Sequence, residues 1–426
     1  MVRQPVDAAL DVFDRLCFKC VETRLFDTAA DFLARFQSTA ASLEPNEMLK
    51  LMMTCQVASN IEFLKAVLVD PQASKVGSLF WEYNGKEDVN SIIPLLTNNC
   101  PELAFLGMQF ARHSAFNFVS KILEHPCTKL KVLEMPPYSE GDLARLFAAL
   151  GQSQVSALTI SSDGSPEFAQ GLCEYLVKDL LVRLELRNYQ QAPPEPVASL
   201  ANCTRLDKLE IKRCYVSQPT SFTDFPKSIT KLVLYDCTFV DGFDWSFLTD
   251  NNVQELDLHD VRGAGGNQLG SALAVHLRTK GLDKLRICDY GFANETLTAV
   301  GVELGRIKRL EIDGNVNDAS IELIALVLQS PNSELRELVL ECTGPTMSSV
   351  ENHLVPALKH PNCNLAELSL GTYHPEHKAT AFGVIGTFRN RRALFALLQG
   401  QQVRRLRSPL RRLPVDLLRL VGKVLI

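Results

Sequence analysis

A short tract of the form L-x-x-L-x-L, mostly with Leu, Ile or Val at its outer sites, returns from about residue 76 to residue 370. Its second site recurs at steps of 23 to 30 residues. The ten clearest copies are Leu130-Leu133-Met135, Val155-Leu158-Ile160, Leu181-Leu184-Leu186, Leu206-Leu209-Ile211, Ile229-Leu232-Leu234, Val253-Leu256-Leu258, Leu282-Leu285-Ile287, Ile307-Leu310-Ile312, Leu335-Leu338-Leu340 and Leu365-Leu368-Leu370. Two looser copies precede them, Val76-Leu79-Trp81 and Leu103-Leu106-Met108. A sustained period of this length marks a chain built from stacked structural repeats.

Each repeat predicts one short strand, because three apolar sites with this spacing cannot share one face of an extended chain unless a turn follows the first. A repeat buries its strand and its return segment only against its neighbours. The repeats therefore predict an α/β solenoid with a parallel sheet on the concave side and mostly helical returns on the convex side. A length of 426 residues would ordinarily suggest two or three domains, but the repeats favour one elongated body.

We expect a solenoid of about 12 repeats over residues 71–385, a helical N-terminal cap over residues 1–70, and a basic helical cap or tail over residues 386–426. The cap is expected to be helical because apolar residues recur at helical spacing, at Leu10, Phe13, Leu16 and Cys17 and again at Phe32, Leu33 and Phe36. Helical returns are expected over residues 142–150, 166–178, 267–278, 293–304, 318–329 and 348–359. The two shortest repeat steps, from 209 to 232 and from 232 to 256, carry prolines and aromatic residues and predict extended or single-turn returns.

Two lead-ins to the repeated tract, His125-Pro-Cys-Thr-Lys-Leu130 and His360-Pro-Asn-Cys-Asn-Leu365, resemble those of the ribonuclease-inhibitor-like class of leucine-rich repeat proteins. The resemblance covers about 300 residues and implies a horseshoe that binds protein partners. One departure concerns the Asn or Cys that usually follows the third apolar site by three residues. It is present as Asn84, Cys214, Cys237 and Asn315 but replaced elsewhere, so the side-chain ladder that satisfies backbone groups at this turn should be incomplete.

The amino-terminal residues carry Asp7 and no apolar core of signal-peptide length, and no run of 18 uninterrupted apolar residues occurs. These observations predict a soluble, cytoplasmic protein. The 12 cysteines suit a reducing compartment, where a free thiol packs as a small hydrophobe. A formal charge of only -5 gives no indication of a nucleic-acid partner, and nothing in the sequence indicates an oligomer.

Residues that flank the second Leu of each tract should point out of the concave sheet, where equivalent residues lie about 4.8 Å apart in columns. Candidate protein-binding residues in these columns are Arg183, Glu185, Arg187, Lys208, Glu210, Lys212, Lys231, Tyr235, Asp257, His259, Arg286, Glu311, Asp313, Glu337 and Glu341. Over 183–212 acidic and basic columns alternate, and ion pairs between them could simply solvate the sheet. Over 311–367 the face turns acidic, with the aromatic pair Tyr235 and His259 nearby, which favours docking of a basic partner.

The last 38 residues differ in charge from the rest: ten basic residues against the single acid Asp416 give a net charge of +9, which leaves -14 for residues 1–388. Four interpretations stay open for this tail. It could cap the final repeat, fold back onto the acidic end of the sheet, or lie on an anionic membrane through its basic, amphipathic end. It also resembles the opening helix of an F-box, which implies a Skp-type adaptor of a cullin ubiquitin ligase; the matching residues are Leu413, Pro414, Leu417, Leu418, Val421 and Leu425.

Catalysis needs converging reactive groups, and the sequence indicates no catalytic, cofactor or metal site. Cys17 and Cys20 form a lone C-x-x-C, predicted on a helix, without a second pair for zinc. The segment from Gly263 to Gly266 lacks the Gly-Lys-Ser/Thr of a phosphate loop, and His374 and His377 have no matching ligand cluster. We therefore predict a non-enzymatic scaffold that recognises a protein on its concave face, with a ubiquitin-ligase substrate receptor and a peripheral membrane scaffold as alternatives.

Overall fold

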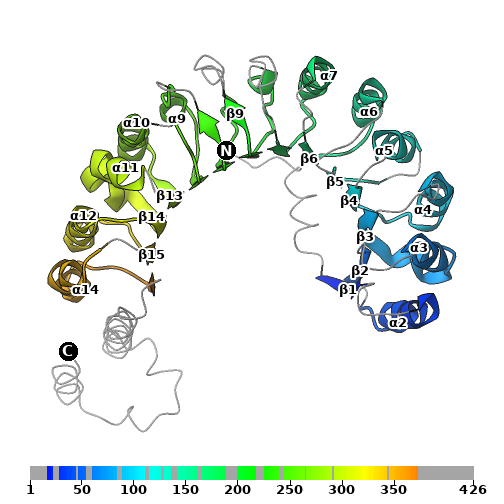
Figure 1. Cartoon of the computed structure of the whole chain (residues 1–426), viewed down its shortest axis with the longest axis horizontal. Helices are drawn as coiled ribbons and strands as arrows, with labels where there is room; N and C mark the ends of the chain where they lie inside the picture. The colour runs from blue at the N-terminus through cyan, green and yellow to red at the C-terminus, as the bar shows by residue number, and fades with distance from the viewer. Residues whose placement is uncertain are drawn as a thin grey trace, which may run out of the picture. The chain divides into compact units, whose positions relative to one another are not determined.

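The computed structural model describes residues 17–22, 28–44, 47–53, 60–83, 89–110, 115–125, 129–135, 142–161, 165–188, 199–216, 225–239, 243–263, 265–289, 292–342 and 345–372. The chain divides into two compact units, unit 1 (Met1–Ile229) and unit 2 (Thr230–Ile426). Each unit is a leucine-rich repeat solenoid in which a parallel sheet lies on one side and helices lie on the other (Figure 1). The predicted α/β fold class is confirmed.

Unit 1 contains eight parallel strands that lie side by side in chain order. They are β1 (Cys17–Glu22), β2 (Glu47–Met53), β3 (Val76–Tyr83), β4 (Phe105–Phe110), β5 (Val132–Glu134), β6 (Ala157–Ser161), β7 (Arg183–Arg187) and β8 (Lys208–Lys212). The described returns include α2 (Ala29–Ala41), α3 (Asn60–Leu68), α4 (Ile93–Asn99), α5 (Ala115–Leu123), α6 (Leu143–Leu150), α7 (Pro166–Leu176), the 3-10 turns η2 (Pro71–Lys75) and η3 (Val89–Ile92), and the two-residue strand β9 (Tyr215–Val216).

Unit 2 continues the same construction. Its sheet strands are β10 (Lys231–Tyr235), β12 (Glu255–His259), β13 (Leu282–Asp289), β14 (Ile307–Gly314), β15 (Glu337–Cys342) and β16 (Glu367–Thr372). The described returns include β11 (Thr238–Phe239), α9 (Phe247–Asp250), α10 (Gly266–Thr279), α11 (Ala293–Val300), η5 (Gly301–Arg306), α12 (Asp318–Gln329), α13 (Met347–Ser349), the π-helical turn η6 (Val350–Leu354) and α14 (Val355–Lys359).

The repeated leucines form the core of each unit. Along a typical strand buried and half-buried residues alternate, because successive side chains point to opposite faces. The second Leu of three successive tracts, Leu256, Leu285 and Leu310, is at most 1% exposed, and these residues pair in register from strand to strand. The strand leucines therefore stack beneath the helices, as the repeat pattern predicts.

The predicted helical returns are confirmed. Three of them are preceded by a polar residue whose side chain accepts a hydrogen bond from a free backbone N–H group in the first turn of the helix. The caps are Asp142, Ser165 and Asn317, whose side chains accept hydrogen bonds from the backbone N–H three residues later at 2.9 to 3.1 Å. In the short return from 232 to 256 the described residues form the two-residue strand β11 and the single turn α9, also as predicted. There the aromatic rings of Phe239, Phe243, Trp245 and Phe247 pack with centroids 4.5 to 6.3 Å apart and fill the space that a longer helix occupies elsewhere.

One turn recurs where strands β7, β8, β10 and β12 end. The residue directly after each strand has a left-handed backbone, with φ between 48° and 56°. These residues are Asn188, Arg213, Asp236 and Asp260. Asn and Asp tolerate this conformation because a short polar side chain can hydrogen-bond locally, whereas Arg has no such compensation.

The helical cap predicted over residues 1–70 contains strands as well as helices, so the prediction of helix at residues 17–22 and 47–53 is wrong. Helices α2 and α3 form, with Phe32 and Phe36 buried on α2, but two strands, β1 and β2, lie between and before them and pair with the rest of the sheet. The physical reason is visible in β2, where Leu49, Leu51 and Met53 alternate with half-buried residues at the period of a strand. The C-x-x-C at 17 and 20 accordingly lies in β1 and not on a helix. The boundary predicted at residue 386 and the tail beyond it lie outside the described residues.

Candidate protein-binding surface

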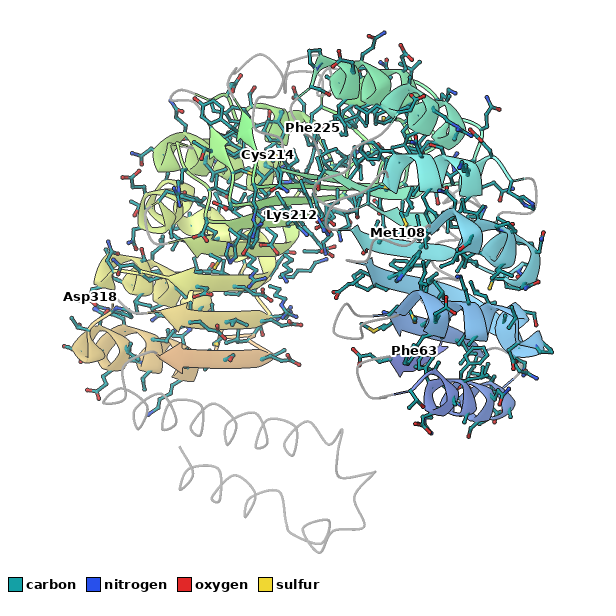
Figure 2. The ribbon with its side chains drawn as sticks, turned by 45° about the vertical axis from the view of Figure 1, so that its right-hand side comes forward. Phe63, Met108, Lys212, Cys214, Phe225 and Asp318 are labelled. Atoms are coloured by element: carbon teal, nitrogen blue, oxygen red, sulfur yellow. The ribbon has the colours of Figure 1, made fainter. Side chains whose placement is uncertain are left out.

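The face of the sheet that points away from the helices, here called the open face, carries the columns of side chains that the sequence predicts. In β7, β8, β10 and β12 the two residues that flank the second Leu are half-buried while that Leu is buried. Strand pairing aligns them residue by residue, for example Arg183 with Lys208 and Glu311 with Val339. Figure 2 shows Lys212 on the strand side of unit 1 and Asp318 on the helix side of unit 2.

In unit 1 the columns of β7 and β8 form a closed network of ion pairs. Arg187 Nε lies 2.7 Å from Glu185 Oε1, and Lys212 Nζ lies 2.6 Å from Glu185 and 2.7 Å from Glu210. Lys208 also pairs with Glu210. Burial raises the pKa of Glu210, but hydrogen bonds from the two lysines outweigh it and hold this pKa below its usual range. Both carboxylates are therefore neutralised within the sheet.

In unit 2 the corresponding network centres on Glu311 of β14. Its carboxylate lies 2.5 Å from Arg309 Nε, 3.1 Å from Lys284 Nζ and 3.6 Å from Arg286 Nε. Arg309 also reaches Glu337 on β15 at 2.8 Å. Burial raises the pKa of Glu311, but hydrogen bonds from Lys284 and Arg309 outweigh burial and hold this pKa below its usual range. The acidity predicted at Glu311 is thus compensated by cations on neighbouring strands.

Two further ion pairs cross the first strands of unit 2. Lys231 Nζ of β10 lies 2.7 Å from Glu255 of β12, and Arg286 lies 3.7 Å from Asp257. Burial raises the pKa of Asp257, against the opposing effect of Arg286 and Lys284. Most of the predicted cations are therefore engaged with carboxylates of adjacent strands.

The third column of unit 2 brings together aromatic and reactive side chains. The rings of Tyr235 and His259 stack with centroids 4.2 Å apart and planes 19° apart, which confirms the predicted aromatic pair. The Nδ1 atom of His259 lies 3.2 Å from an Asp260 carboxylate oxygen. On the next strand the Cys288 thiol donates to Asp313 at 3.3 Å. Burial and this carboxylate raise the pKa of Cys288 to about 12, so the thiol is protonated at neutral pH and is not a nucleophile.

Carboxylates gather on the open face of the last strands, β14 to β16. Pairing places Asp313 opposite Glu341 and Glu337 opposite Glu367. Glu341 and Glu367 are exposed, and neither forms an ion pair with another described residue. On the open face of these three strands, Arg309 is the single cation beside these four carboxylates. Arg309 also pairs with Glu311. Like charges directly opposite each other on one face of a sheet destabilise it.

The described residues contain no group of three or more His, Cys, Asp or Glu side chains arranged to hold a metal ion. The segment predicted to be a loop at 263–266 leads into α10. The eight cysteines whose state is described are free thiols, among them buried Cys100 and Cys203 and exposed Cys20. Within the described part of the chain, no helix is long and apolar enough to cross a membrane.

Not all predicted site residues are described. The F-box-like residues of the tail, from Leu413 to Leu425, and the histidines at 374 and 377 lie outside the described residues. One feature was missed by the reasoning from sequence: the open face of β2 to β5 carries half-buried Met52, Phe80, Phe105 and Val132 together with the charged residues Lys50 and Glu134. The rule that locates the charged columns, the residue before or after the second Leu, would have found Phe80, Phe105 and Val132.

Comparison with known proteins adds a distant structural likeness. No family model matches the chain, and no curated protein matches it. Among solved structures the chain is similar to one described as the crystal structure of a TLR13–ssRNA13 complex, at 15% sequence identity and a TM-score of 0.44. The likeness covers 79% of this chain and 54% of that chain, so this chain spans about half the length of that protein. The fold of this chain is defined by its own sheets and helices.

Proposed function

We propose that this protein is a non-enzymatic recognition scaffold, and that the open face of unit 2 binds a basic segment of a protein partner on β14 to β16. The observation that carries the proposal is the register pairing of Asp313 with Glu341 and of Glu337 with Glu367. Such like-charge pairs cost stability in the unbound sheet. A cationic partner would relieve that repulsion, so the arrangement favours binding over mere solvation.

The stacked pair Tyr235 and His259 supports the same surface. Aromatic side chains are enriched at protein interfaces because they bring contact area with little loss of conformational freedom. In unit 1, by contrast, the β7 and β8 carboxylates are already paired with Arg187, Lys208 and Lys212. That cluster fits the solvating interpretation. A polyanion such as a nucleic acid would meet repulsion at the acidic end of unit 2, so a protein partner fits this end better.

Charge reversal on the open face tests the proposal. The double variant Glu341→Lys/Glu367→Lys is compared with Glu322→Lys/Glu351→Lys, which changes the net charge equally but on the exposed helical side of the same unit. Full-length proteins are used as baits in cell extract and captured proteins are quantified by mass spectrometry. We expect the open-face variant to lose its basic partner by at least about tenfold, because reversing a charge contact changes binding by more than 1.4 kcal/mol. Equal loss or equal retention in both variants would contradict the proposal.

The alternatives assign a role to the basic tail. A ubiquitin-ligase receptor requires adaptor binding through the F-box-like residues, and Leu417→Asp should abolish adaptor capture while leaving the open-face partner bound. A membrane scaffold requires tail binding to anionic vesicles that weakens with salt. The tail could also be the basic segment that occupies the open face. In that case replacing Arg411 and Arg412 with Gln should increase capture of the external partner, because the competitor is weakened.

A further inference from the structure

The open face of β2 to β5 in unit 1 carries an apolar strip that differs from the charged columns of β7 and β8. Its large side chains are Met48, Met52, Phe80, Phe105 and Val132, all half-buried on the side of the sheet away from the helices. An open sheet face normally carries polar residues. Large apolar side chains gathered on such a face mark an interaction site.

Gly107 shows how tightly this strip is built. It pairs with Phe80 on β3, and a Cβ atom at this position would lie 2.7 Å from Phe80 Cδ2 and 3.0 Å from Phe105 Cε1. Both rings therefore lie close to the bare backbone of β4 at Gly107. Any larger residue at 107 would displace them.

Charged residues of both signs lie among and beside these apolar side chains. Lys50 lies between Met48 and Met52 on β2, in the same column as Phe105 and Val132, and it forms no ion pair with another described residue. Glu134 of β5 pairs with Gly107 and so lies in the column of Met52 and Phe80. Glu22 of β1 and Glu82 of β3 lie toward one border of the strip. An occupant with one apolar side and one acidic side would therefore fit in a single orientation, with its acids next to Lys50.

The chain itself holds such a segment directly before β1. In residues 6–16 an α-helical period places Val6, Ala9, Leu10, Phe13 and Leu16 on one side. The acids Asp7, Asp11 and Asp14 recur at steps of four and three residues and fall together next to that side. The apolar stripe matches the apolar strip, and the acidic stripe matches Lys50.

Position and length agree with this pairing. Residue 16 leads straight into β1, which pairs with β2 at the edge of the strip. A helix of these eleven residues would be about 16 Å long, and the four strands β2 to β5 span about 14 Å at roughly 4.8 Å per step. We propose that residues 6–16 dock as an amphipathic helix across the open face of β2 to β5 and cover the apolar strip. This inference is independent of the function proposed for unit 2.

Site-specific photocrosslinking in the full-length protein tests it. A benzophenone amino acid replaces Phe80, where it preserves an aromatic ring, and in a control protein it replaces Val177, which is 62% exposed at the end of α7 in the same unit. Equal amounts of light and isotopically heavy protein are mixed before irradiation, so that crosslinks within one chain are distinguished from those between copies.

We expect crosslinks from position 80 to residues 6–16 of the same chain, and none to that segment from position 177. A second variant, Leu10→Asp/Phe13→Asp, should lower the yield at least about tenfold, since burial of one large apolar side chain is worth about that factor or more in an equilibrium constant. Far-UV circular dichroism confirms that the repeats of this variant remain folded. Crosslinks only to a second copy, only to another protein, or to no part of residues 6–16 would overturn the proposal.

Discussion

Arg213 has a left-handed backbone conformation, which Asn or Asp adopts at the equivalent turn of neighbouring repeats. Its φ is 54°, against 56°, 50° and 48° for Asn188, Asp236 and Asp260 at the same turn. The left-handed region costs an ordinary L-residue roughly 1 to 2 kcal/mol, and Asn avoids part of that cost. Arg213 is exposed and forms no ion pair with another described residue, so its side chain offers no compensation. We therefore predict that Arg213→Asn stabilises unit 1 by about 0.5 to 1 kcal/mol.

Two further substitutions separate backbone strain from side-chain effects. Arg213→Gly also removes the Cβ clash, but it adds roughly 0.4 to 1 kcal/mol of unfolded-state entropy, so its net effect should be near zero. Arg213→Val, which is β-branched, should destabilise the unit by about 1 kcal/mol or more. The order of stability is therefore Asn, then Gly and Arg together, then Val.

The assay is urea unfolding followed by circular dichroism, with native-state hydrogen exchange of the β8 amides to report unit 1 separately, because the opening of a repeat protein can be local. For a unit of about 200 residues the predicted gain corresponds to a rise in Tm of roughly 1 to 4 °C. If Arg213→Asn is no more stable than the wild type and Arg213→Val is no less stable, the left-handed turn does not exist at this position and the reasoning fails.

Three further predictions concern single side chains. Burial raises the pKa of Glu134, so its ionised form destabilises the folded state. Glu134→Gln should therefore be more stable than the wild type at pH 7.5, and this gain in stability should shrink toward zero as the pH falls below 4.5. A gain that does not depend on pH would refute this prediction. Asn317→Ala removes the acceptor of the Ser320 N–H at the start of α12 and should cost about 1 kcal/mol in urea unfolding, with Asn317→Asp as the near-neutral control. Iodoacetamide at pH 8 should modify exposed Cys20 well before Cys288, whose pKa of about 12 keeps it protonated; equal rates measured by peptide mapping would contradict the described burial.

The charged columns could be predicted residue by residue, because a strand has a period of two and the second Leu fixes its phase. Arg183, Glu185 and Arg187 point to the open face for that reason, and so do their partners on the next strand. The outcome at Glu311 could not be predicted in the same way. Whether the Glu311 carboxylate is neutralised depends on the rotamers of Lys284 and Arg309 and on their distances from it, which the sequence does not specify.

The first two strands escaped prediction for a different reason. In β2 the buried residues Leu49, Leu51 and Met53 alternate, but the tract lacks the L-x-x-L spacing of the later repeats, and its pairing with β3 shifts register between Leu49 and Lys50. A single short alternation next to helical segments does not distinguish a strand from the end of a helix. Pairing with the rest of the sheet decides the structure there.

Photocrosslinking from the open face of unit 2 shows whether this face binds a basic segment. A benzophenone amino acid at Ser369, an uncharged exposed position of β16, is compared with the same group at Leu326, which is 54% exposed on the helical side in α12. Full-length protein is irradiated in cell extract and the crosslinked peptides are identified. The account predicts that position 369 captures a segment of net positive charge that position 326 does not capture. Acidic or uncharged segments at position 369, or the same proteins at both positions, would contradict it.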